Sequence, residues 1–113
     1  MADDVKKFYE DFKTAAGKMA KLIPDGASGF GQLFAKTMKE GALTVKQKEL
    51  IALSVGLALR CDPCIRLHVQ KSLAAGATKE EILEAAQVVL MMGGGPVYTY
   101  IPRIIETIEA LQE

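Results

Sequence analysis

The residues best suited to chemistry in this 113-residue chain are its two cysteines and its only histidine. Cys61 and Cys64 are separated by two residues, and His68 follows Cys64 by four. The thiolate form of cysteine is a nucleophile, and histidine is the side chain that gains or loses a proton near neutral pH. A nucleophile, a second thiol and a base therefore occupy one short segment, which predicts thiol redox chemistry.

The same three residues are expected to share one face of a helix. Pro63 suits the first turn of a helix, because the N–H group that it lacks is not needed there. Successive helical residues turn by about 100°, so positions 61, 64 and 68 fall within an arc of roughly 60°. At a helix N-terminus the Cys64 thiolate is stabilised by the helix dipole, and the imidazole one turn later can take its proton. Such a thiolate can attack a peroxide, become a sulfenic acid and condense with the second thiol.

Glu49 is the candidate partner for His68. A catalytic base needs a group that orients it and stabilises its protonated form. Glu49 lies at the polar edge of a predicted helix that precedes the cysteines, and a turn at residues 60–62 would fold that helix back beside the next one. The predicted site therefore consists of Cys64, Cys61, His68 and Glu49.

The elements that must position these residues are all expected to be helices. Half of the residues are hydrophobic and none is tryptophan, so aliphatic side chains must fill the core, and Ala and Leu favour helices. The length fits one domain, and no alternating strand pattern is present. We predict an all-α fold, a single domain over residues 1–113 with about six helices. Apolar spacings of three and four place these helices before Pro24 and at Phe30–Met38, Thr44–Leu59, Asp62–Ala75, Thr78–Met92 and Ile101–Leu111.

Local signals give the boundaries of several helices. Residues 25–29, Asp-Gly-Ala-Ser-Gly, are typical of a loop. Gly41 and Gly76 are expected to be left-handed residues that close the second and fourth helices. Capping boxes open the third and fifth helices, with Thr44 and Gln47 at the first and Thr78 and Glu81 at the second.

The third helix is unusual because Ser54 is its only polar side chain between Leu50 and Leu59. A helix that is apolar all round is expected to be buried all round. This stretch is too short to span a bilayer, so we expect it at the centre of the fold or in a subunit interface. The second option predicts a homo-oligomer. The spacing in the fifth helix also predicts that Met92 is buried.

The charge of the chain excludes several classes of partner. Fourteen basic and fourteen acidic residues cancel without forming blocks, so neither nucleic acid nor a membrane is an expected partner. Arg66 and Lys71 are expected on a solvated face. The charged N-terminus lacks the apolar stretch of a signal peptide, which favours a cytoplasmic location. In that reducing compartment a cysteine pair is expected to be catalytic or metal-binding rather than a structural disulfide.

The spacing of the site residues resembles the active-site signature of alkylhydroperoxidase D, within the wider family of carboxymuconolactone decarboxylase-like proteins. Gaps of twelve, three and four positions separate the members of the set, which are Glu49, Cys61, Cys64 and His68. The resemblance covers about residues 30–100 and includes the Met-Gly-Gly-Gly-Pro segment at 92–96. Four residue types at fixed spacing are a fairly specific signature, whereas a bare Cys-x-x-Cys is not.

The resemblance implies a role for each site residue. Cys64 would be the peroxidatic nucleophile, Cys61 the resolving thiol and His68 the base, with Glu49 relaying or balancing its proton. It also implies a homo-oligomer, commonly a trimer or hexamer, a small hydroperoxide or disulfide as substrate and a thiol reductant as electron donor, with no cofactor. Pro63 stands where alkylhydroperoxidase D has a second histidine.

Three other interpretations of the same residues stay open. The first is a lactone decarboxylase, although decarboxylase members of the family lack the cysteine pair. The second is a zinc site formed by Cys61, Cys64 and His68 with a water molecule, although such a cluster on one helical turn is unlike ordinary zinc modules. The third is a non-enzymatic helical module whose apolar third helix serves assembly.

Overall fold

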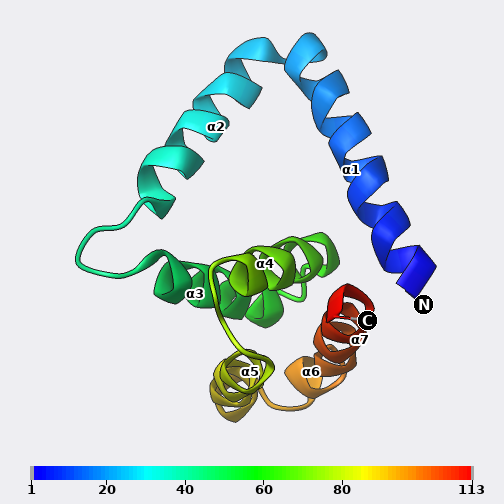
Figure 1. Ribbon diagram of the computed structural model, residues 1–113, viewed down its shortest axis with the longest axis vertical. Helices are drawn as coiled ribbons and strands as arrows, with labels where there is room; N and C mark the ends of the chain where they lie inside the picture. The colour runs from blue at the N-terminus through cyan, green and yellow to red at the C-terminus, as the bar shows by residue number, and fades with distance from the viewer. Residues whose placement is uncertain (1, 113) are drawn as a thin grey trace.

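The computed structural model describes residues 2–112, and every regular element in that range is a helix (Figure 1). Six longer helices and one single-turn helix follow one another, which confirms the predicted all-α class. No helix in the described range is long and apolar enough to cross a bilayer. The elements are α1 (Ala2–Leu22), α2 (Pro24–Met38), α3 (Val45–Ala58), α4 (Asp62–Ala74), α5 (Lys79–Gly93), α6 (Gly95–Tyr98) and α7 (Ile101–Gln112).

The core lies where α3, α4, α5 and α7 meet. In Figure 1, α1 and α2 form the two arms of an inverted V, whose apex lies away from α3 and α4. Burying an aliphatic side chain completely stabilises a fold by about 1.5–3 kcal/mol. Six such side chains with no exposed surface hold the four helices together, namely Leu57, Ile65, Val69, Ile82, Ile104 and Ile108.

The turn between α3 and α4 reverses the chain through a left-handed residue. The N–H of Cys61 donates to the carbonyl of Gly56 (2.9 Å) and the N–H of Arg60 donates to that of Leu57 (3.0 Å). This is the Schellman arrangement, which needs a left-handed residue after the helix, and here Arg60 takes that position with φ 55°. The end of α4 closes in the same way around Gly76, at φ 96°, which confirms that prediction.

Both predicted capping boxes are confirmed. The N–H of Gln47 donates to Thr44 Oγ1 (3.1 Å), and Gln47 Oε1 accepts from the N–H of Thr44 (2.9 Å). Thr78 and Glu81 make the same pair of hydrogen bonds at the start of α5. These side chains satisfy N–H groups that have no partner within their helices.

The two ends of α2 differ from the prediction. Residues 25–29 form the first turns of α2 rather than a loop, because Pro24 occupies the first turn and its fixed φ suits a helix there. Gly41 is not left-handed and does not close the helix. The Lys48 ammonium group instead donates to two backbone carbonyls at the end of α2, at 2.8 and 2.6 Å. A cation from α3 therefore takes the place of the expected glycine cap.

Some of the apolar residues that the sequence places in the core lie on the surface of the single chain. On α3, Leu53 and Leu57 are buried, but Ile51 and Val55 on other faces are 51% and 52% exposed. Met92 is 78% exposed, and α2 buries none of its residues. The prediction that α3 is buried all round is therefore wrong for one chain, and the homo-oligomer stays a prediction.

The aromatic side chains of α1 attach this helix to α4. The Tyr9 hydroxyl donates to the backbone carbonyl of Arg66 at 2.5 Å, and the Arg66 guanidinium lies 5.2 Å from the centre of the Phe8 ring. The side chain of Arg66 is only 14% exposed, so its prediction as a solvated residue is wrong. Burial raises the pKa of Tyr9 to about 12, against a smaller opposite effect of Arg66.

Replacing Tyr9 by phenylalanine is expected to change how stability depends on alkaline pH. The ordinary tyrosine pKa is 10.0, and the pKa of Tyr9 in the folded protein is about 12. The neutral phenol therefore makes its full contribution to the free energy of unfolding below pH 10. It is lost as the pH rises toward 12, because the ionised ring must leave its buried position. Urea unfolding between pH 10 and 12 should show that the free energy of unfolding falls more steeply with pH for wild type than for Tyr9→Phe. Parallel curves would contradict the raised pKa of Tyr9 in the folded protein.

Candidate active site

The two cysteines form a disulfide at the N-terminus of α4. Cys61 is the N-cap residue, Cys64 lies in the first turn, and their Cα atoms are 5.2 Å apart. The N–H of Cys64 donates to Cys61 Sγ at 3.4 Å, and Pro63 occupies the first turn as predicted. Both cysteines are partly exposed. The positive end of the helix dipole favours a thiolate at this position once the bond is reduced.

Gly56 sets how closely α3 approaches this disulfide. A Cβ atom at Gly56 would lie 2.9 Å from Cys64 Cβ, a distance that real side chains do not adopt. The carbonyl of Gly56 also accepts the N–H of Cys61. Gly56 therefore contacts both ends of the Cys-x-x-Cys segment. The sequence analysis did not single out Gly56, although a glycine inside a helix is destabilising and can indicate a close approach of another segment.

A buried pair, Glu49 on α3 and His68 on α4, lies one turn beyond Cys64 along α4. His68 Nδ1 and Glu49 Oε1 are 2.8 Å apart, and Glu49 is 5% exposed. A buried carboxylate requires a hydrogen-bonding partner, because desolvation is otherwise too costly. An ionised carboxylate only accepts hydrogen bonds, so His68 Nδ1 is the donor of this contact whenever Glu49 is ionised. The structure thus brings Glu49 from α3 to the helix that carries the other three predicted residues.

Phe34 of α2 covers the imidazole of this pair. Its ring stacks on that of His68, with centroids 6.2 Å apart and planes inclined by 20°. Lys71 Nζ lies 5.2 Å from the centre of the Phe34 ring, so Lys71 is held at an aromatic face rather than simply solvated. A cavity of about 540 Å³ opens beside Phe34, between α1, α2 and α4. No sequence pattern pointed to α2 as part of the site, because apolar helical spacing is equally typical of core residues.

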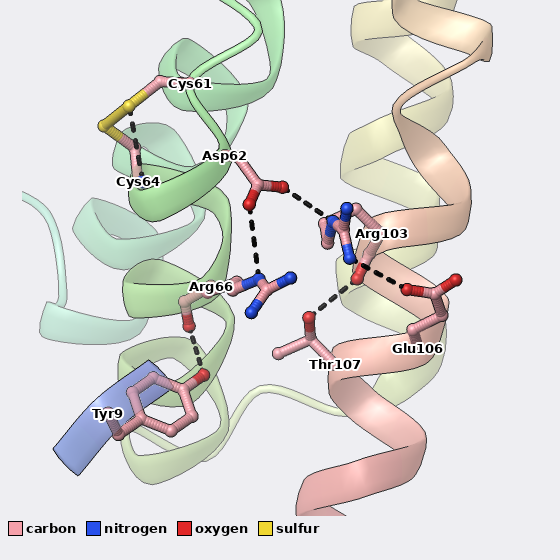
Figure 2. A network of polar contacts seen from close by, with 8 residues as sticks. All are labelled: Tyr9, Cys61, Asp62, Cys64, Arg66, Arg103, Glu106 and Thr107. Carbon is pink, nitrogen blue, oxygen red and sulfur yellow. Dashed lines mark hydrogen bonds and ion pairs between the residues drawn. A yellow bond between two sulfur atoms is a disulfide. The ribbon is translucent and has the colours of Figure 1, made fainter. Parts of the chain in front are cut away.

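Asp62, between the two cysteines, connects α4 to α7. Its Oδ1 lies 2.6 Å from Arg103 Nε and its Oδ2 lies 3.4 Å from Arg66 Nε. Figure 2 shows the Asp62 side chain directed toward α7, away from the disulfide. Arg103 also contacts Glu106 Oε2 at 3.1 Å. Forty-one positions separate Asp62 from Arg103, so no local sequence pattern could have found this network.

The arrangement of the thiols differs from that of a zinc site. The sulfur atoms of Cys61 and Cys64 are bonded to each other. Within residues 2–112, no three His, Cys, Asp or Glu side chains are grouped as ligands for a metal ion. The geometry therefore presents a disulfide-bonded pair of sulfur atoms.

The sequence model of the carboxymuconolactone decarboxylase family matches residues 24–106, a range that contains all four predicted site residues. Two uncharacterized proteins are similar over almost their whole length. One, from Cupriavidus necator, is 28% identical over 111 residues, which cover 98% of each chain. The other, from Haemophilus influenzae, is 31% identical over 106 residues, which cover 94% of each.

Two solved structures resemble this fold. A carboxymuconolactone decarboxylase family protein from Legionella pneumophila, in its apo form, is 35% identical with a TM-score of 0.93. That match covers 98% of this chain and 99% of the other. A protein of the same family from Thermotoga maritima, for which a role in the antioxidative response has been suggested, is 34% identical with a TM-score of 0.83. It covers 94% of this chain and 90% of the other.

Adding one methyl group at Gly56 is expected to disturb the disulfide segment. In Gly56→Ala the new Cβ must push Cys64 away, and overpacking of this kind typically costs about 1–3 kcal/mol. Gly17→Ala on α1 is the matched control, because a Cβ there meets nothing within 4 Å and should stabilise the helix by about 1 kcal/mol. Urea unfolding of the two oxidised variants measures both effects. Equal stabilisation by the two substitutions would show that α3 and α4 are not in close contact at this point.

Proposed function

Because this chain belongs to the carboxymuconolactone decarboxylase family, we propose that it is a thiol-dependent oxidoreductase that reduces hydroperoxides through Cys61 and Cys64. The observation that carries the proposal is the buried Glu49–His68 contact one helical turn from a disulfide. A pair of sulfur atoms that can be oxidised thus lies beside a group that can exchange protons. The antioxidative role suggested for the Thermotoga maritima relative supports the same class of activity.

The first step of the proposed reaction oxidises Cys64. The Cys64 thiolate attacks the terminal oxygen of a hydroperoxide, a sulfur–oxygen bond forms and the oxygen–oxygen bond breaks. The leaving alkoxide takes a proton and departs as an alcohol, and protonated His68 is the proposed donor. Cys64 is left as a sulfenic acid. The two electrons that reduce the peroxide come from the sulfur atom.

The second step forms the disulfide that the structure contains. The Cys61 thiolate attacks the Cys64 sulfur, the sulfur–oxygen bond breaks, and hydroxide leaves and is protonated to water. Two thiols and one hydroperoxide are thus converted to one disulfide, one alcohol and one water. An external dithiol then reduces the disulfide by thiol–disulfide exchange and is itself oxidised. The proposed cycle therefore requires an external dithiol as the electron donor.

In this scheme Glu49 acts on the sulfur atoms only through His68. Its carboxylate fixes the orientation of the ring and stabilises the protonated imidazole that forms when a thiol is deprotonated. Because Glu49 is buried, solvent weakens this interaction little. Phe34 covers the ring from the side of α2 and limits access of water to it.

Mixing reduced protein with an alkyl hydroperoxide in a stopped-flow instrument tests the proposed function. Wild type should lose two thiols per chain and release one alcohol. Cys64→Ser should consume no peroxide, whereas Cys61→Ser should react once and accumulate a sulfenic acid that a dimedone probe captures. The two single variants control for each other, since each removes one sulfur from the same helix end.

Two results would contradict the proposal. One is peroxide consumption that does not depend on Cys64. The other is turnover of a carboxylated lactone by the Cys61→Ser/Cys64→Ser double variant, which would assign the site to decarboxylation instead.

A further inference from the structure

We propose that Arg103 is a positioning residue of the dithiol site, which acts by holding and neutralising the Asp62 carboxylate between the two cysteines. The inference rests on the proposed function, because the Cys64 thiolate is the group that benefits. Without Arg103, Asp62 would keep only its longer contact with Arg66, and its negative charge in the first turn of α4 would oppose formation of that thiolate more strongly. A residue on the last helix thus sets the reactivity of a nucleophile on α4.

The geometry of Asp62 supports this role. Each carboxylate oxygen has its own arginine, with Arg103 Nε at 2.6 Å from Oδ1 and Arg66 Nε at 3.4 Å from Oδ2. Figure 2 shows the carboxylate turned toward these two guanidinium groups, on the side of the helix away from the disulfide. Arg103 is itself held by Glu106 at 3.1 Å. The shorter contact therefore comes from a different helix, and it fixes where the charge of Asp62 lies.

Charge at the N-terminus of α4 explains why this position matters. The positive end of the helix dipole stabilises an anion in the first turn, and Asp62 and a Cys64 thiolate both occupy that turn. Two neighbouring anions repel each other, which disfavours the charged form of the weaker acid, the thiol. A guanidinium group bound to the carboxylate offsets this repulsion. The helix N-terminus can then stabilise the Cys64 thiolate even though an acidic residue, Asp62, lies between the two cysteines.

Other charged groups lie on the elements that carry or contact this end of α4 and must be held constant in a test. They lie on the α3–α4 turn, on α3, on α4 and on α7, and they are Arg60, Glu49, His68, Arg66 and Glu106. None of them is altered in the variants below. Any change in thiol reactivity can therefore be assigned to Asp62 and Arg103.

The test is the rate at which iodoacetamide alkylates Cys64 in the reduced protein, followed against pH with the modified peptide identified by mass spectrometry. Arg103→Gln should lower the rate at neutral pH by about three- to tenfold, as expected for one charge at this range in a partly solvated site. Asp62→Asn should raise it by a similar factor. The double variant should return close to wild type, and all four proteins should reach the same plateau at alkaline pH.

Opposite effects of the two partners distinguish an electrostatic role from a structural one. If the ion pair only held α7 against α4, breaking it from either side would change the rate in the same direction and would lower the alkaline plateau. That result would overturn the inference, as would unchanged rates in both single variants.

Two further variants keep the test decisive. Arg103→Lys retains the charge and should stay within about twofold of wild type, even if Arg103→Gln folds poorly. Asp11→Asn removes an exposed carboxylate that pairs with Lys7 on α1, changes the net charge as Asp62→Asn does, and should leave the rate unchanged. A rate increase in Asp11→Asn as large as that in Asp62→Asn would attribute the effect to net charge and overturn the inference.

Alkylation needs no peroxide, so its outcome separates this inference from the proposed function. If Arg103→Gln and Asp62→Asn change the alkylation rate in opposite directions but the protein does not react with hydroperoxide, the role of Arg103 stands and the peroxidase function is rejected. If the protein reduces peroxide but the Asp62 and Arg103 variants are alkylated at the wild-type rate, the proposed peroxidase function stands and the role of Arg103 is rejected.

Discussion

The close contact between α3 and α4 at Gly56 is the constraint on which the rest of the site depends. Because Gly56 has no side chain, α3 lies directly against the Cys64 backbone, and the left-handed Arg60 turns the chain back within a few residues. The two helices then run side by side, which carries Glu49 to His68. One packing contact therefore positions both the sulfur atoms and the proton-exchanging pair.

The site around this contact contains two acidic side chains, Glu49 and Asp62, each of which is paired with neighbouring side chains. Glu49 is buried on α3, and the nearby imidazole of His68 compensates for its desolvation. Asp62 is compensated by two arginines on the other side of α4. The N-terminal half of α4 thus has a paired acid on each side, with the disulfide at its end. Burying the Glu49 carboxylate costs stability, and its contact with His68 offsets that cost.

The sequence predicted those parts of the structure that depend on local signals. Capping boxes and the glycine at position 76 were found because each depends on residues a few positions apart. The prediction of a loop at residues 25–29 was wrong because Pro24 starts a helix that contains the glycines of this segment. The left-handed conformation of Arg60 was not predicted, because arginine carries no sequence signal for it. Arg103 and Phe34 were missed because their contacts with the site are set by packing between distant segments. The four spaced residues were predicted from their chemistry and from the resemblance of their spacing to a family signature, and the structure shows the contact that holds Glu49 against His68.

The central claim is that Glu49 and His68 act on the dithiol as one unit. A double-mutant cycle on the rate of peroxide-driven disulfide formation tests it most directly, with Glu49→Gln, His68→Gln and the double variant compared at one pH. The account predicts that each single substitution slows the reaction by about 10²-fold or more and that the double variant is hardly slower than His68→Gln. Effects that multiply in the double variant would show that the two residues act independently and would contradict the account.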